Sequence, residues 1–351
     1  QYTHDNGLNA MHRGFDLPWR LCASPDSVDP LRAGPILAGA ESAPSSTPPV
    51  NNVPEAETAV PHLDPQAAMR WRLQPRAESP WLHEEVASRM VERLQWFRDK
   101  PGSWLHWEPI NGGLRAHEQL LAVLPGAAVH VASSQMPEAL EATRESRALS
   151  WNPKHWLRGR SPLPAGEGTR VGMVWANMAL HTEPLPLALL RRWHEAIETN
   201  GFLMFSCLGP DTLRELRTLY ARLGWPEPTH PFTDMHDWGD MLVHSGFAEP
   251  VMDMERISLS YSGAMPMLQD LRLLGRNLHT HRFPGLRSRA WRATLCETIE
   301  AECPRSEDGR LLLTLEIIYG HAFKPTPRVK LDATTAVSMD DMRAMLRSGR
   351  R

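Results

Sequence analysis

Short apolar runs that alternate with amphipathic segments limit this chain to few folds. The runs that we expect to form strands are 104–107, 127–132, 171–176, 202–207, 250–261 and 311–319. Segments with helical spacing separate the first four runs, which is the pattern of βαβ units. Such units build a mainly parallel sheet with helices on both faces. We therefore predict a doubly wound α/β fold in which the two late strands carry an antiparallel edge.

The expected helices follow from apolar residues spaced three or four positions apart. In the first of them Leu82 and Met90 share one side, and charged residues take the other. Pro210 suits the first position of a later helix. Ordered structure should begin near Trp81, and 151–168 should form an irregular insertion. The ranges predicted as helical are 81–94, 114–124, 136–149, 185–197, 210–223, 237–244, 265–274 and 291–301.

Composition divides the chain into three parts. Residues 1–65 are dominated by Pro, Ala, Ser and Glu, as in 43–49. A segment of this kind cannot bury enough apolar surface to offset the entropy lost on ordering. We expect 1–65 to be a disordered extension, 66–327 to be the folded domain and 328–351 to be a surface tail.

Charge and cysteine content exclude several classes of protein. The 351 residues are 42% hydrophobic, which suffices for a substantial core, and the formal net charge of −3 gives no electrostatic footprint for nucleic acid. No apolar window reaches the length of a membrane span. The four cysteines, Cys22, Cys207, Cys296 and Cys303, lack the paired spacing of a zinc site or a disulfide framework. We expect a soluble, cytoplasmic protein that binds neither nucleic acid nor membrane and holds no metal ion.

The stretch 104–114 reads as strand, tight turn and helix, because its apolar run breaks at Gly112 and Gly113. A glycine-lined turn lets backbone N–H groups approach a nucleotide-like ligand, and the next helix adds the positive end of its dipole. Glycines at such connections also occur for their backbone angles alone. The turn is therefore a candidate ligand site with an ordinary structural alternative.

Ligands of parallel sheets bind at the carboxyl ends of the strands. By this rule 108–113, Ser133 with Ser134, 177–181 and 207–210 should lie along one rim. His181 follows a strand end directly, so it could face the ligand. It could equally be a loop histidine that is bonded to the backbone.

The segment 232–237 places Asp234 and Asp237 around His236. This composition would permit metal binding or acid–base chemistry. We favour a structural interpretation, in which Asp237 is a helix N-cap and Asp234 with His236 orders the preceding turn.

Several motifs occur together in the order and spacing of one known family. They are 174–181, 201–206, 208–216, 232–240, 246–247, 250–253 and 319–322. In these motifs the chain resembles the malonyl-acyl-carrier-protein O-methyltransferases of biotin synthesis. The resemblance covers about 81–325. It implies a class I methyltransferase fold, with a seven-stranded Rossmann-like sheet, that binds S-adenosylmethionine.

The resemblance also implies roles for individual residues. Asn177, Met178 and Leu180 would border the methionine and sulfonium end of the cofactor, and His181 would face the substrate cleft. The substrate would be the free carboxylate of a malonyl thioester on an acyl carrier protein. A carboxylate is already a nucleophile, so no general base is needed. The full set of expected cofactor-binding residues is Glu108, Asn111, Gly112, Gly113, Ser133, Asn177, Met178 and Leu180.

A basic neighbourhood near the C-terminus could meet an acidic carrier protein by charge complementarity. Solvated helix and loop charges are the common alternative for such a group. Its members are His279, His281, Arg282, Arg287, Arg289 and Arg292.

The cofactor turn departs from the family's pattern. The family has an acidic residue followed by spaced glycines, whereas Glu108 is followed here by Pro109 and Ile110. Ser133 and Ser134 stand where an acidic residue normally holds the ribose hydroxyls. Loss of one or two charge-assisted hydrogen bonds, each worth about 1.5–3 kcal/mol, would weaken cofactor binding by about one to four orders of magnitude. The alternative function is therefore a catalytically inactive binding or assembly protein that keeps the scaffold.

Overall fold

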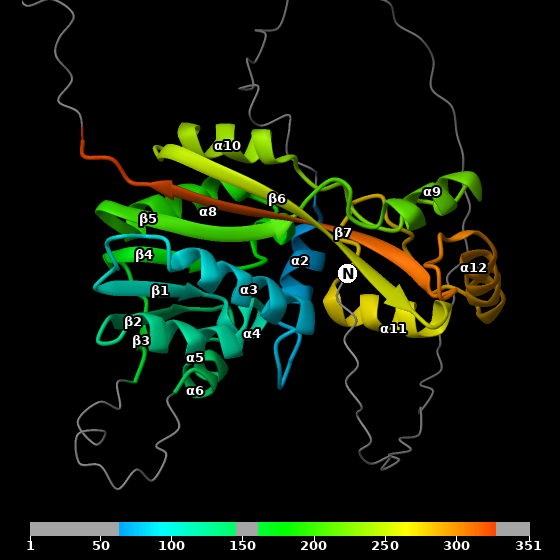
Figure 1. Cartoon of the computed structure of the whole chain (residues 1–351), viewed down its shortest axis with the longest axis horizontal. Coiled ribbons are helices and arrows are strands. Elements are labelled where there is room, and N and C mark those ends of the chain that lie inside the picture. The colour runs from blue at the N-terminus through cyan, green and yellow to red at the C-terminus, as the bar shows by residue number, and fades with distance from the viewer. Residues whose placement is uncertain (1–62, 145–160, 328–351) are drawn as a thin grey trace, which may run out of the picture. The chain divides into compact units, whose positions relative to one another are not determined.

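The predicted alternation folds into one sheet of seven strands within residues 63–144 and 161–327, which the computed structural model describes (Figure 1). The order across the sheet is β3-β2-β1-β4-β5-β7-β6. The strands are β1 (Ser103–Trp107), β2 (Ala128–Ala132), β3 (Leu163–Pro164), β4 (Val171–Ala176), β5 (Ile197–Leu208), β6 (Ala248–Tyr261) and β7 (Leu311–Phe323).

The sheet is mainly parallel, as predicted. β1 pairs in parallel with β2 and β4, and β4 pairs in parallel with β5. β7 runs antiparallel to both β5 and β6, so the antiparallel strand is inserted beside the edge strand β6. The class I Rossmann-like fold expected from the resemblance is confirmed.

Helices cover both faces of the sheet, as the amphipathic segments predict. The α-helices of the described residues are α2 (Pro65–Arg72), α3 (Trp81–Leu94), α4 (Pro109–Gly112), α5 (Leu114–Val123), α6 (Met136–Ala142), α8 (Pro186–Ala196), α9 (Arg214–Arg222), α10 (Met235–His244), α11 (Ala264–Leu274) and α12 (Arg289–Glu302). On one face Met90 of α3 packs with Trp104 and Trp175 of the sheet. On the other face Trp193 of α8 and Trp238 of α10 pack with other strand residues. These tryptophans are core residues.

The outer halves of β6 and β7 extend beyond the other strands and carry their own apolar cluster (Figure 1). Leu311 and Leu313 of β7 pack there against α9, α11 and α12. This part of the molecule forms a lobe beside the carboxyl ends of the parallel strands.

Two predicted helix starts are wrong. The helix predicted from Pro210 begins at Arg214, because Leu213 adopts a left-handed φ of 57° that a helix cannot contain. Asp237 is not an N-cap, since α10 already begins at Met235. Asp234 caps it by accepting the N–H of His236.

Ordered structure begins before Trp81, contrary to our expectation. Asp64 caps α2 by accepting the N–H groups of Gln66 and Ala67, and Pro65 occupies the first helical position. The sequence of α2 is short and polar, which is why helical periodicity did not reveal it. The disordered extension and the surface tail that we predict lie, apart from residues 63–65, outside the described residues, as does most of the predicted insertion.

Within the described residues, no helix has the length and apolar character needed to cross a membrane. The same part of the chain holds no cluster of His, Cys, Asp or Glu that could bind a metal ion.

Candidate functional site at the carboxyl ends of the strands

Residues from four strand ends meet at one edge of the sheet. Glu108 follows β1, Ser133 follows β2, Asn177 follows β4, and Leu208 ends β5. The right-handed βαβ arrangement brings these ends together although they are far apart in sequence. The rim that the sequence predicts therefore exists in the fold.

The carboxylate of Glu108 is buried and joins the ends of β1 and β2. One carboxylate oxygen accepts the N–H and the hydroxyl of Ser134, at 2.8 and 2.6 Å, and the other accepts the hydroxyl of Ser133 at 2.9 Å. Glu108 holds this position with a left-handed φ of 50°. The serines that replace the expected acidic residue are thus partners of the acidic residue of the neighbouring strand.

The turn after Glu108 forms the short helix α4 rather than an open glycine loop. Its amide hydrogen bonds run from Gly112 to Glu108 and from Gly113 to Pro109. Ile110 is buried, and it packs against Val131 of β2 and Ala139 of α6. The bulk of Ile110 is therefore taken up by the core between α4 and α6.

The geometry of the turn favours glycine at position 112 and requires it at position 113. A Cβ on Gly112 would lie 3.3 Å from the Trp107 carbonyl oxygen and 3.4 Å from that of Asn177. Gly113 has a φ of 120°, which only glycine adopts without strain. The double glycine has a structural reason in addition to any role with a ligand.

The amino end of α5 is capped by a side chain that the sequence analysis did not identify. Glu84 of α3 accepts the N–H groups of Leu114, Arg115 and Ala116 at 2.9 to 3.3 Å. An internal carboxylate thus occupies the helix end that we expected to offer its dipole to a ligand.

Asn177 is buried and ties β4 to three other segments. Its amide donates to the carbonyl oxygens of His83, at 2.8 Å, and Gly112, at 2.5 Å. Its side-chain oxygen accepts the hydroxyl of Ser206 at 2.6 Å, and the same hydroxyl accepts the N–H of Met178. The hydrogen-bonding groups of Asn177 are used to position the turn.

Met178 and Leu180 are both buried, in different apolar clusters. Met178 has a left-handed φ of 52° and packs with the α3 side of the sheet. Leu180 lies in a short 3₁₀ helix, Leu180–Thr182, and packs with the α8 side. Their proposed contact with a cofactor stays a prediction.

His181 is only 8% exposed, and its ring is bonded to a backbone N–H group. Its Nδ1 accepts the N–H of Leu208 at 3.4 Å, and its carbonyl oxygen lies 2.9 Å from Nε2 of His230. Burial, with the nearby rings of His230 and His83, holds the pKa of His181 well below its ordinary value. The ring is therefore neutral at pH 7, and the edge of Phe232 lies beside it.

In the segment 232–237, Asp234 and His236 order the turn before α10, as we favoured, whereas Asp237 is not the cap. The N–H of His236 donates to the Asp234 carboxylate at 2.8 Å, and this bond is the largest cause of the lowered pKa of Asp234. Asp237 follows in the first turn of α10.

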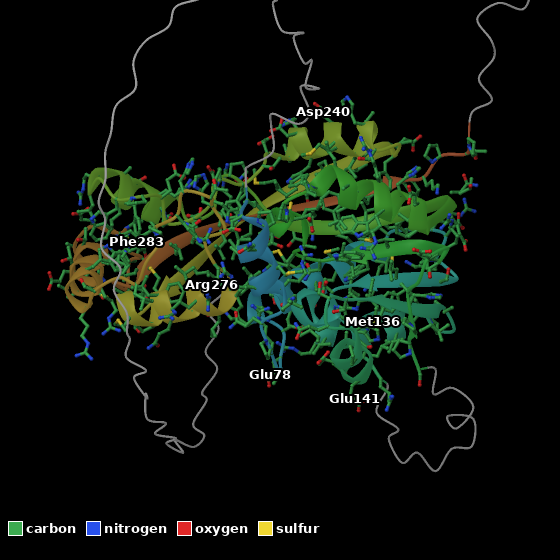
Figure 2. All side chains as sticks on the ribbon, turned by 180° about the vertical axis from the view of Figure 1, so that it is seen from behind. Glu78, Met136, Glu141, Asp240, Arg276 and Phe283 are labelled. Atoms are coloured by element: carbon green, nitrogen blue, oxygen red, sulfur yellow. The ribbon has the colours of Figure 1, made fainter. Side chains whose placement is uncertain are left out.

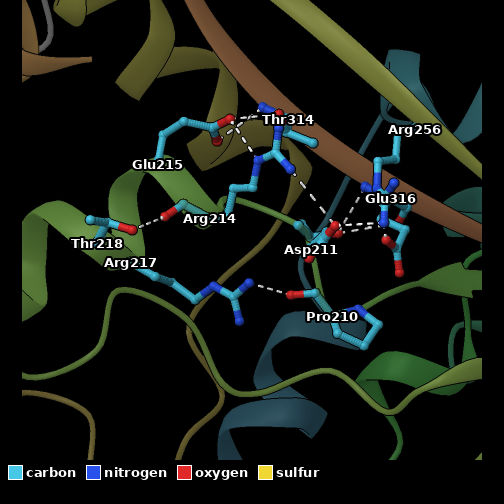
Figure 3. A network of polar contacts seen from close by, with 10 residues as sticks. Pro210, Asp211, Arg214, Glu215, Arg217, Thr218, Arg256, Thr314 and Glu316 are labelled. Atoms are coloured by element: carbon cyan, nitrogen blue, oxygen red, sulfur yellow. Dashed lines mark hydrogen bonds and ion pairs between the residues drawn. The ribbon is translucent and has the colours of Figure 1, made fainter. Parts of the chain in front are cut away.

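The motif after β5 is held to β7 by a polar network (Figure 3). Arg256 of β6 lies between the carboxylates of Asp211, at 2.8 Å, and Glu316, at 3.4 Å. Glu215 accepts the N–H and hydroxyl of Thr314. Burial, then the charge of Asp211, raises the pKa of Glu316. These bonds fix the 208–216 motif at the rim.

Helix α2 and the residues after it cover the strand ends. The carbonyl oxygen of Arg72 accepts a bond from Gln135, after β2, at 2.9 Å. The Arg72 guanidinium pairs with Glu183, after β4, at 2.8 Å. Arg76 donates to the side-chain oxygen of Asn111 in the turn after β1. The sequence analysis identified none of these covering contacts.

Comparison with known proteins places the chain in a family. It is 37% identical over 264 residues to the malonyl-[acyl-carrier protein] O-methyltransferase of Gallionella capsiferriformans, covering 73% of this chain and 88% of that protein. It is 38% identical over 265 residues to the protein of the same name from Laribacter hongkongensis, covering 72% and 86%. The chain belongs to the malonyl-[acyl-carrier protein] O-methyltransferase family. No family model matches it.

Membership of this family confirms the resemblance found from the motifs. A third relative with the same name, from Nitrosospira multiformis, is 32% identical over 268 residues and covers 71% of this chain and 85% of its own. In this member of the methyltransferase family, the rim carries one buried carboxylate from β1, two serines from β2 and an asparagine from β4.

Proposed function

We propose that this chain is an S-adenosylmethionine-dependent O-methyltransferase that methylates the free carboxylate of a malonyl group carried by an acyl carrier protein. The observation that supports this function most strongly is the identity of 37–38% to relatives named for that reaction, over most of their length. The fold and the predicted rim agree with it.

Two features of the rim fit the cofactor. The Glu108 oxygen that faces Ser133 accepts one bond from the described residues, and a carboxylate oxygen has room for a second, so it could take a ribose hydroxyl. Nη2 of Arg76, beside Asn111, is buried without a hydrogen-bond partner in the part of the chain that the structure describes. Glu108 with Ser133 would hold the ribose, and Asn111 with Gly112 would lie along the amino-acid end.

The residues of the chain would bind and orient the reactants rather than move a proton. When bound, the cofactor supplies an electrophilic methyl group, and the substrate carboxylate is nucleophilic in its ionised form. Alignment and exclusion of water then account for much of the rate. His83 and His181 fit such a site, because burial lowers the pKa of His83 to about 4 and holds that of His181 well below its ordinary value, which keeps both rings uncharged.

The carrier protein would dock on the exposed start of α12. Arg289 and Arg292 are exposed there, whereas Arg282 pairs with Asp64 and Arg287 stacks on Phe283. Charge reversal of Arg289 and Arg292 should raise the KM for malonyl-carrier protein by about tenfold, or ~1.4 kcal/mol. The KM for a small malonyl thioester should not change, and Arg191→Glu on α8 is the control. Equal KM values for parent and variant would contradict docking of the carrier protein at the start of α12.

Calorimetry of the full chain with S-adenosylmethionine tests the proposed reaction. Binding should be measurable, and mass spectrometry should then detect one added methyl group on malonyl-carrier protein but none on acetyl-carrier protein, which lacks the free carboxylate. Absence of binding at millimolar cofactor would overturn the proposal and leave the inactive scaffold protein. Binding without transfer to the malonyl group would overturn the substrate assignment.

A further inference from the structure

Two arginines lie against the ring of one buried tryptophan beside the rim. The guanidinium carbon of Arg76 is 3.8 Å from the ring centroid of Trp71, and that of Arg276 is 5.3 Å from it. Arg76 comes from the segment after α2, whereas Arg276 follows α11, and Figure 2 shows Arg276 beside α2. Two distant parts of the sequence thus bring like charges to one place.

One N–H donor group of Arg76 has no acceptor among the described residues. One of its terminal nitrogens donates to the Asn111 side chain, and the other, Nη2, is buried and without a partner among the described residues. A buried N–H of a charged group without an acceptor is costly. This arrangement points to an acceptor that is supplied from outside the chain.

The surrounding charge favours an anion. Burial and the charge of Arg276 lower the pKa of Arg76 to about 10, so the group stays cationic at pH 7 but its charge is disfavoured. Nearby Arg72 and Arg282 are neutralised by Glu183 and Asp64. No carboxylate among the described residues lies within ion-pair distance of Arg76.

A pocket borders Trp71, the ring on which Arg76 lies, on the side of Arg276. It has a volume of about 710 Å³ and is lined by Trp71, Arg276 and Arg70 among others. On its other side Arg76 contacts Asn111, which belongs to the turn after β1. An anion held by Arg76 would therefore lie next to the site of methyl transfer.

We infer that Arg76, backed by Trp71 and Arg276, forms a carboxylate-binding subsite at the mouth of the rim. A guanidinium presents paired N–H groups that match the two oxygens of a carboxylate. The identity of that carboxylate rests on the proposed function, which supplies two candidate carboxylates. One is the amino-acid end of the cofactor and the other is the malonyl group.

The test compares parent, Arg76→Gln and Arg76→Lys in full-length protein. Calorimetry measures Kd for S-adenosylmethionine and for its decarboxylated analogue. Kinetics at saturating cofactor measures the KM for a small malonyl thioester. Thermal unfolding measures the stabilisation by malonate against chloride at equal ionic strength. Arg191→Gln, an exposed arginine of α8, is the control.

The two sources give different results. If the cofactor supplies the carboxylate, Arg76→Gln weakens binding of S-adenosylmethionine about tenfold or more and leaves the decarboxylated analogue unchanged. If the malonyl group supplies it, the cofactor Kd stays constant while the KM for the malonyl thioester rises about tenfold. In both cases Arg76→Lys, which keeps the charge without the fork, lies between parent and Arg76→Gln.

Equal weakening of both cofactor forms, or no change in any Kd or KM, would overturn the subsite and leave Arg76 a positioning residue for Asn111. A parent that binds no cofactor and transfers no methyl group would overturn the proposed function alone. In that case the malonate measurement tests the subsite. Stabilisation of the parent by malonate, but not of Arg76→Gln, supports the subsite, and equal stabilisation of both proteins refutes it.

Discussion

Glu84 accepts the N–H of Leu114 at 2.9 Å, so a carboxylate of α3 caps the amino end of α5. The same carboxylate also accepts the N–H groups of Arg115 and Ala116. The turn between β1 and α5 is thereby held in place by α3, the helix that precedes β1 in the chain. Its geometry depends on tertiary packing and not on the glycines alone.

Glu84→Ala should lower the free energy of unfolding by about 2–3 kcal/mol, because three backbone donors lose a charged acceptor. Urea unfolding at pH 7 measures this change. Glu85→Gln is the control, because Glu85 is exposed and pairs with Arg89 at the surface. Its free energy of unfolding should differ from that of the parent by no more than about 0.5 kcal/mol. Equal effects of the two variants would contradict the capping role.

Asn177 and Ser206 should show strong energetic coupling. The Ser206 hydroxyl donates to Asn177 and accepts the N–H of Met178, so each residue satisfies the other in a buried site. Asn177→Ala should cost about 3 kcal/mol, because it also leaves the carbonyl oxygens of His83 and Gly112 without this donor. A double-mutant cycle with Ser206→Ala should give a coupling energy of about 1–3 kcal/mol. Additive changes in the free energy of unfolding would contradict the coupling between Asn177 and Ser206.

The sequence predicts the strands of the rim well but misses what covers them. β1 and β4 are found because buried parallel strands are continuous apolar runs, and Asn177 is found because it ends one of them. Glu84 and Arg76 are missed because their partners lie about 30 residues away in the sequence, and nothing local indicates the contact. The pair Asp64 and Pro65 is a helix-start signal that could have revealed α2.

Buried neutral histidines should make the protein less stable in mild acid. The pKa of His83 is lowered from 6.5 to about 4, chiefly by burial, so between these values the unfolded chain binds a proton that the folded chain does not. Stability is therefore full above pH 6.5 and is lost as the pH falls towards 4. His83→Gln, which can still donate to the Asn111 carbonyl oxygen, should reduce the slope of unfolding free energy against pH by up to ~1.4 kcal/mol per unit.

Urea unfolding at several values between pH 5 and 7 measures that slope. His281→Gln changes an exposed histidine and should leave the slope as in the parent. A His83→Gln slope equal to that of the parent would mean that the pKa of His83 is the same in the folded and unfolded chain.

Ser133→Asp tests whether the β2 end can carry the acidic residue that the resemblance leads us to expect there. Because the Ser133 hydroxyl lies 2.9 Å from a Glu108 oxygen, the new carboxylate would meet an existing one. Repulsion should raise the pKa of one carboxyl and cost about 1–2 kcal/mol at pH 7. The cost is present above the unfolded pKa of about 4 and disappears below it.

The double variant Glu108→Gln with Ser133→Asp removes this conflict, because the amide can donate to the new carboxylate. It should recover the lost stability and bind S-adenosylmethionine about tenfold more tightly than Ser133→Asp alone, since the acceptor for the ribose then stands at the end of β2. Urea unfolding at pH 7 and calorimetry measure the two effects. Recovery of stability without tighter binding would mean that a carboxylate at position 133 cannot take over from Glu108 as the acceptor of the ribose hydroxyls. Failure to recover either would contradict the pairing of the two strand ends.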